Sequence, residues 1–187
     1  MARRTDPAPE TGTTEARPLR RGWTTGACAT AATKAAFQAL LTGTFPDPVE
    51  ITLPKGERPS FSLARTALSG EEATAGIVKD AGDDPDVTHL ALVLSTVRRL
   101  PPGSGVVFRA GIGVGTVTKA GLPIPPGEPA INPVPRQMMR DAVAEVTAHF
   151  GATPDVEITI SIPNGAELAK QTWNPRLGIE GGLSILG

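Results

Sequence analysis

The chain has 187 residues, of which 40% are hydrophobic, so it is long enough for one domain with a full apolar core. Its net charge of −1 argues against a nucleic acid or a membrane surface as a partner held by bulk electrostatics. Cys28 is the single cysteine, which excludes an internal disulfide and a cysteine metal cage and favours a reducing, cytoplasmic location.

The N-terminal part predicts a lead-in followed by a helix. Residues 1–18 are rich in Pro, Thr and Glu without apolar periodicity, so we expect a disordered lead-in before a domain over residues 19–187. A helix is predicted over 27–41, with Thr24 or Thr25 as its N-cap. Its alanine-covered face would pack closely on a sheet, and its start would suit an anion. We interpret Cys28 as a small buried residue rather than a nucleophile, because no histidine lies near it in the sequence.

Alternating and apolar segments predict a sheet. Strands are expected over 49–53, 61–68, 73–79, 90–97, 106–110 and 156–162. Residues 120–135 contain six prolines and predict an extended loop. A second helix is predicted over 134–150, ending at Gly151. The chain therefore predicts an α+β fold, a mixed sheet of about six strands with two main helices packed on it.

Two helix-to-strand units share one pattern. The first helix leads into Val49-Glu50-Ile51-Thr52-Leu53 and the second into Val156-Glu157-Ile158-Thr159-Ile160, each followed by a turn that contains Pro and Gly. We hypothesise that the two units occupy equivalent positions in the fold. The apolar run at the end of the sequence looks like the start of another strand, so we expect this chain to be the front part of a longer protein.

Residues 111–119 combine glycines with polar side chains. Three glycines alternate with apolar residues, and Thr116, Thr118 and Lys119 follow. In an extended segment this alternation leaves one face without side chains, so a flat ligand or another backbone could lie on it. A glycine-rich turn between two strands is the alternative. A phosphate-binding P-loop is disfavoured, because the spacing differs and the following prolines exclude a helix.

An acidic segment precedes the predicted strand at 90–97. Asp80, Asp83, Asp84 and Asp86 are followed by His89. Their oxygens could hold a hard cation, or they could form a turn stabilised by Asx hydrogen bonds. The proline after the third aspartate keeps that residue extended, so the carboxylates need not converge. Crowded carboxylates would also raise one another's pKa values, which suits a proton acceptor.

Five segments resemble the signature blocks of the CbiD family, the cobalt-precorrin-5B C-1 methyltransferases of oxygen-independent cobalamin biosynthesis. They are residues 22–29, 79–89, 111–119, 127–136 and 174–179. The resemblance runs from about Leu19 to Gly187 in the same order and with similar spacing. Leu90 stands where the family usually has glycine, and Ala120 where it usually has proline. Family members continue for roughly as many residues again, so the resemblance implies that the C-terminal half is absent here.

The resemblance implies methyl transfer from S-adenosylmethionine to ring carbon C-1 of the tetrapyrrole cobalt-precorrin-5B, giving cobalt-precorrin-6A in anaerobic cobalamin biosynthesis. Cobalt would arrive only as part of this small-molecule substrate, so no metal held by protein side chains is expected. No nucleic acid or membrane partner is expected, and a homodimer is left open. The alternative is a non-catalytic tetrapyrrole-binding or assembly domain, because activity could require the second half.

The site residues follow from these segments and from the chemistry of a flat ring with carboxylate arms. We expect a proton acceptor among Asp83, Asp84 and His89, with the aspartates first. The substrate contacts are expected to be hydroxyls, side-chain-free glycines and cations that match carboxylates. They are Thr24, Thr25, Gly111, Gly113, Gly115, Thr116, Thr118, Lys119, Arg136 and Arg176.

Overall fold

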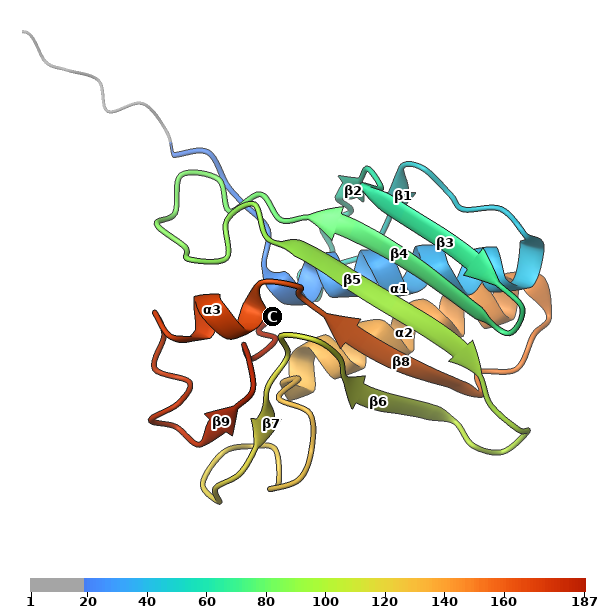
Figure 1. The fold of residues 1–187 in the computed structure, drawn as a ribbon. Helices are drawn as coiled ribbons and strands as arrows, with labels where there is room; N and C mark the ends of the chain where they lie inside the picture. The colour runs from blue at the N-terminus through green and yellow to red at the C-terminus, as the bar shows by residue number, and fades with distance from the viewer. Residues whose placement is uncertain (1–18) are drawn as a thin grey trace, which may run out of the picture.

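The computed structural model describes residues 19–187 as a two-layer α+β fold (Figure 1). A five-stranded mixed sheet has its helices on one face, which confirms the predicted fold class with one strand fewer in the main sheet. The disordered lead-in expected over residues 1–18 lies outside the described residues. Within residues 19–187, no helix combines the length and apolarity needed to cross a membrane.

The main sheet has the strand order β3-β4-β5-β8-β6. The strands are β3 (Arg65–Ser69), β4 (Glu72–Val78), β5 (Leu92–Arg99), β6 (Val106–Ala110) and β8 (Val156–Ser161). Neighbours are antiparallel except β6 and β8, which are parallel. Burial alternates along β5 and β8, so one face of the sheet is apolar. The other face is polar, with Glu157 between Arg98 and Arg109.

Two long helices cover the apolar face. Helix α1 (Thr25–Thr42) packs on β4 and β5 and along α2 (Pro133–Phe150). The alanines of α1 allow this close approach, and Thr33 Oγ1 lies 2.8 Å from Ser95 Oγ on β5. The side chain of Thr24 accepts a hydrogen bond from the Ala27 N–H, which confirms the predicted N-cap. Gly151 ends α2 in the left-handed conformation, as expected.

The two helix-to-strand units do not occupy equivalent positions, so that hypothesis is wrong. Strand β1 (Val49–Glu50) pairs only with β2 (Ser60–Phe61) in a separate small sheet, whereas β8 lies inside the main sheet. The strand predicted over 49–53 is shorter because the Leu53 N–H turns back to the Glu57 carbonyl at 2.8 Å. The strand predicted over 61–68 is divided between β2 and β3.

A small lobe, residues 111–131 and 165–187, lies beyond one end of the main sheet (Figure 1). It contains β7 (Thr116–Val117), β9 (Ile179–Glu180) and the short helix α3 (Gly165–Ala169). Gly113, Gly165 and Gly182 meet where this lobe joins the sheet. A Cβ on Gly165 or Gly182 would overlap the Gly113 carbonyl, and a Cβ on Gly113 would overlap the Ile162 carbonyl. The three backbones can approach this closely only because they carry no side chains.

We predict that Gly182→Ala lowers the free energy of unfolding by about 3 kcal/mol, because the new methyl group would displace packed backbone. The adjacent Gly181 has a φ of 86° and no atom near the added Cβ, so Gly181→Ala should cost only about 1 kcal/mol of backbone strain. Urea unfolding of both variants measures the difference. Equal losses would show that the junction is not packed as described.

Leu90 is a non-glycine residue in the left-handed backbone conformation, which favours glycine. Its φ is 62°, and among residues 19–187 no other non-glycine residue has a positive φ. Its N–H donates to the Lys79 carbonyl at 2.8 Å, which holds the turn into β5. The side chain is 65% exposed, so little packing offsets the strain. This conformation gives a physical reason why glycine would suit the position.

We predict that Leu90→Gly raises the free energy of unfolding by about 0.5–1 kcal/mol, since relief of strain exceeds the entropy that glycine adds to the unfolded chain. Thermal and urea unfolding would measure the gain. Leu177→Gly is the matched control: Leu177 is half exposed and has no positive φ. This variant should lose stability, and a loss at both positions would contradict the strain at Leu90.

Candidate functional site

The CbiD-like segments meet at the end of the sheet where α1 begins. The Trp23 N–H donates to the Asp80 carbonyl at 2.8 Å, which joins residues 22–29 to the acidic segment. The Gly26 N–H donates to the Leu186 carbonyl at 2.7 Å, and the Leu183 N–H donates to the Gly113 carbonyl at 2.9 Å. The C-terminal segment therefore lies between the start of α1 and the glycine-rich segment.

A pocket of about 420 Å³ opens at this meeting point. We call it the threonine pocket. Thr24 and Thr25 form one wall. The others are formed by residues 86–88 and 172–174 and by Leu183, Ser184 and Leu186. The lining is mainly apolar, with hydroxyl groups among it, and the volume falls within the range of small-molecule sites. Trp173 is 69% exposed at its rim, and the guanidinium carbon of Arg176 lies 4.8 Å from the Trp173 ring centroid.

The start of α1 has fewer free N–H groups for an anion than the sequence predicts. The Ala27 N–H is used by Thr24 and the Gly26 N–H by Leu186, so two of the expected anion donors bind the chain itself. Cys28 is fully buried, and burial raises the pKa of its thiol to about 12. The interpretation of Cys28 as a buried structural residue is confirmed.

The glycine-rich segment does not form an open ledge, and that expectation is wrong. An added Cβ on Gly111 would overlap Ser161 Oγ, and one on Gly115 would lie 2.5 Å from Ile179 Cγ2. With Gly113 at the junction described above, all three glycines face the chain's own atoms. Their alternation serves backbone packing, the other use that the pattern allows. Direct substrate contact by Gly111, Gly113 and Gly115 stays a prediction.

Two of the four aspartates of the acidic segment, Asp80 and Asp86, are paired with cations. Arg20 makes a bidentate pair with Asp80, and the hydrogen bond from its guanidinium is the main reason why the pKa of Asp80 falls to about 2. The expectation that crowding raises these pKa values is therefore wrong for Asp80. No group of three or more His, Cys, Asp and Glu side chains gathers to hold a metal ion in residues 19–187.

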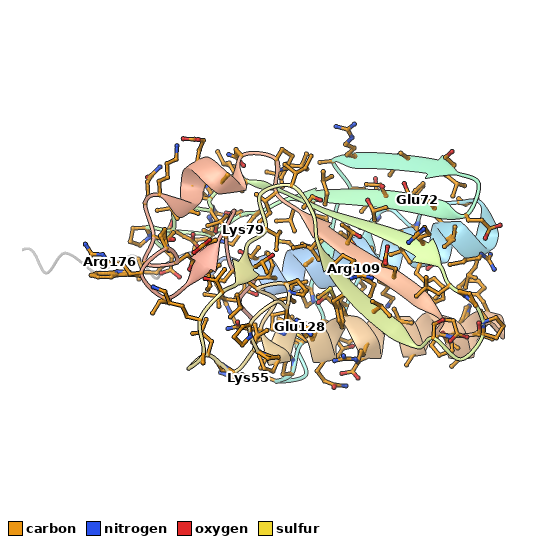
Figure 2. The ribbon with its side chains drawn as sticks, turned by 60° about the horizontal axis from the view of Figure 1, so that its bottom comes forward. Lys55, Glu72, Lys79, Arg109, Glu128 and Arg176 are labelled. Atoms are coloured by element: carbon orange, nitrogen blue, oxygen red, sulfur yellow. The ribbon has the colours of Figure 1, made fainter. Side chains whose placement is uncertain are left out.

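Asp86 is paired with the buried Lys79, whose structural role was not predicted from the sequence. Lys79, which is labelled in Figure 2, is 1% exposed. Its Nζ lies 2.7 Å from Asp86 Oδ2. Burial alone would raise the pKa of Asp86, but hydrogen bonds from Lys79 and from the Thr88 N–H and hydroxyl lower it overall. The signal in the sequence is a lysine at the end of a buried strand, close to several aspartates.

The three candidate proton acceptors differ in what they already bind. Asp83 Oδ2 accepts the Arg20 N–H at 2.5 Å. His89 Nδ1 accepts the Ala81 N–H at 3.1 Å, so the neutral ring carries its proton on Nε2. The exposed carboxylate of Asp84 accepts no hydrogen bond from the described residues. Asp84 is therefore the candidate whose carboxylate is unengaged.

The expected cations also differ. Arg136 is largely buried, with 17% of its side chain exposed, and it donates to Ile131 O at 2.8 Å and to Glu128 and Pro129. It holds the loop before α2. Lys119 and Arg176 are both exposed on the small lobe, and Figure 2 shows Arg176 at the outer edge of the molecule.

The remaining predicted contacts, Thr116 and Thr118, also belong to the small lobe. Thr116 pairs with Glu180 between β7 and β9, and the Thr118 hydroxyl donates to Gly178 O at 3.0 Å. The structure thus brings Thr24 and Thr25 to the threonine pocket and Asp83, Asp84 and His89 to the adjoining acidic segment. It places Thr116, Thr118, Lys119 and Arg176 on the lobe beside it.

Comparisons with known sequences cover nearly the whole chain. The CbiD family model matches residues 12–187. A cobalt-precorrin-5B C(1)-methyltransferase of Brucella anthropi is 66% identical over 180 residues, which cover 96% of this chain and 49% of that protein. The protein of the same name from Brucella ovis is 66% identical over 169 residues, covering 90% of this chain and 46% of that protein. The chain thus spans about half the length of these curated relatives.

The comparison with solved structures supports the fold as well. The 1.9 Å crystal structure of the cobalamin biosynthesis protein CbiD from Archaeoglobus fulgidus matches with a TM-score of 0.68 at 30% sequence identity. The match covers 90% of this chain and 52% of that chain. From the match over residues 12–187 and the close identity to its members, this chain belongs to the CbiD family.

Proposed function

We propose that this chain supplies the substrate-binding and proton-accepting part of a cobalt-precorrin-5B C-1 methyltransferase. The supporting observation is that three of the five CbiD-like segments, residues 22–29, 79–89 and 174–179, contribute to the lining of the threonine pocket, with the unengaged carboxylate of Asp84 on the loop that leads to it. The reaction would transfer the methyl group of S-adenosylmethionine to C-1 and yield cobalt-precorrin-6A. Because Cys28 is an unpaired cysteine, the proposal includes a cytoplasmic location.

The threonine pocket suits one edge of the substrate rather than all of it. Its volume of about 420 Å³ is too small for a complete corrin-type ring with its carboxylate arms. The ring would therefore lie across the rim, where Trp173 offers an exposed aromatic face. Arg176 and Lys119 are the cations beside that rim, and they would pair with the ring carboxylates.

The chain's residues would position the reaction rather than supply unusual chemistry. When bound, S-adenosylmethionine supplies a methyl group activated by its sulfonium sulfur, and cobalt enters as part of the substrate. The electron pair of C-1 forms the new carbon–carbon bond as the bond to sulfur breaks. The pocket would hold the ring edge away from water, and Asp84 would accept a proton released from the ring.

A second candidate is a tetrapyrrole-binding or assembly domain without activity of its own. The observation that favours it is length, because the chain spans 49% of the Brucella anthropi relative. The two candidates share ring binding and differ only in turnover. Binding and turnover are therefore tested separately.

We predict that Trp173→Ala weakens binding of cobyrinic acid, a cobalt corrin with free carboxylates, about tenfold. This loss corresponds to about 1.4 kcal/mol and is the size expected when a stacking aromatic is removed. Spectrophotometric titration of the corrin bands measures it. Phe150→Ala is the matched control, because Phe150 is 40% exposed at the far end of α2 and should not affect binding. Equal affinities in all three proteins would refute a ring site at Trp173.

We predict that Asp84→Asn lowers turnover at least tenfold and changes substrate affinity less than twofold, because the amide cannot accept the proton. The assay uses a chimera in which this chain replaces the matching region of the Brucella anthropi relative. Glu72→Gln, at an exposed position of β4, is the control. Retained turnover in Asp84→Asn would remove the proton-accepting role. A 187-residue chain that binds corrin without turnover, beside an active chimera, would favour the second candidate.

A further inference from the structure

The loop from Trp173 to Gly178 carries an aromatic face and a cation of the proposed ring site. Its turns are closed by its own backbone, because the Arg176 N–H donates to the Trp173 carbonyl and the Ile179 N–H to the Asn174 carbonyl, each at 3.0 Å. Asn174 is 8% exposed, so the loop is anchored on its inner side. Trp173 and Arg176 are both exposed. The loop therefore presents these two side chains from a hydrogen-bonded backbone.

Gly178 ends this loop and lies directly under the side chain of Lys119. Its φ is 77°, and it is buried. A Cβ added to Gly178 would lie 2.6 Å from the Cβ of Lys119, 2.7 Å from its Cγ and 2.8 Å from its Cδ. The aliphatic stem of the lysine therefore runs along the Gly178 backbone. A residue with a side chain at this position would leave no room for the stem.

The residue before Lys119 holds it against the loop. The Thr118 N–H donates to the Gly178 carbonyl at 2.7 Å, and the Thr118 hydroxyl donates to the same carbonyl at 3.0 Å. Lys119 itself is exposed, and its ammonium group makes no ion pair with any residue in 19–187. The stem of the lysine is thus placed by the chain, whereas its charge is left for a ligand.

We propose that Gly178 is a positioning residue for Lys119. Because Gly178 lacks a side chain, the lysine stem lies along the loop, and the ammonium group of Lys119 and the guanidinium group of Arg176 serve the same carboxylate-bearing ligand. Gly178 is two residues from Arg176, so the two cations meet at one turn. The ligand class, a corrin with carboxylate arms, rests on the proposed function. The placement of Lys119 by Gly178 rests on the contact alone.

The first test titrates the 187-residue chain with two cobalt corrins: cobyrinic acid, whose arms are carboxylates, and cobinamide, whose arms are amides. We expect Lys119→Met and Gly178→Ala each to weaken cobyrinic acid binding about fivefold, the size of one exposed ion pair, and to leave cobinamide binding unchanged. The double variant should bind no more weakly than Lys119→Met alone, because both changes remove the same contact.

Two matched controls separate the lysine contact from backbone strain and from general charge. Gly181 has a φ of 86° and no atom within 4 Å of an added Cβ, so Gly181→Ala introduces similar strain without touching Lys119. Lys55 is exposed and lies away from Arg176 in Figure 2, so Lys55→Met removes an equal charge elsewhere. Both variants should bind cobyrinic acid like the parent chain. Melting temperatures establish that all variants are folded.

A second measurement follows Lys119 without any corrin. Reductive methylation with isotope-labelled formaldehyde marks the lysine ammonium groups for NMR and keeps their charge, and the Lys119 signal is the one missing from Lys119→Met. We expect Gly178→Ala to shift this signal and Gly181→Ala to leave it in place, because only the first adds a methyl group against the stem. An unshifted signal in Gly178→Ala, or equal shifts in both variants, would overturn the inference.

Two results of the titration would also overturn it. Additive losses in the double variant, or equal weakening of both corrins by Gly178→Ala, would show that Gly178 acts through the shape of the loop rather than through Lys119. A parent chain that binds neither corrin would instead refute the proposed ring site. In that case the lysine signal still decides whether Gly178 places Lys119, so the two failures are distinguishable.

Discussion

The close approach of three backbones at Gly113, Gly165 and Gly182 fixes the position of the small lobe at the end of the sheet. This junction holds the C-terminal segment against the glycine-rich segment through the Leu183 N–H. Two residues further along, the Ile185 N–H donates to the Ala130 carbonyl at 2.8 Å. The wall of the threonine pocket is therefore built from contacts between distant parts of the chain. A side chain at the junction would separate these parts before it affected any catalytic group.

The sequence was sufficient to predict the elements whose ends depend on neighbouring residues in the chain. The strand at 106–110 follows from a short run rich in apolar residues, and the capping of α1 by Thr24 follows from its hydroxyl group. The segment 49–53 alternates apolar and polar residues but makes a strand of only two residues, because its pairing partner is the two-residue strand β2 rather than the main sheet. Alternating glycines were ambiguous for the same reason, since only tertiary structure decides whether a ligand or a backbone covers them.

The acidic segment shows why residue types alone did not define the site. From the sequence, its aspartates differ only in order, and mutual repulsion is the visible effect. In the fold, Arg20 arrives from 60 residues away to pair with Asp80, and Lys79 turns inward to pair with Asp86. Each pairing lowers a carboxylate pKa and commits that residue to structure. Asp83 accepts the backbone N–H of Arg20. Asp84 is the aspartate whose carboxylate accepts no hydrogen bond from the described residues, and the spacing of the aspartates does not predict this difference.

The cations differ in how many contacts they make with the chain itself, and this difference limits which of them could bind a carboxylate-rich ring. Arg136 binds the loop that supports the C-terminal segment, so using it for substrate would loosen the pocket wall. Lys119 and Arg176 are exposed and do not hold the pocket wall in this way, and both belong to the small lobe. The threonine pocket is lined by Trp173 from that lobe and by Asp86 from the acidic loop. A ring edge in the pocket would therefore meet cations on one side and the proton acceptor on the other. In the proposed function, this arrangement would separate the cations that pair with the ring carboxylates from the carboxylate that accepts the proton.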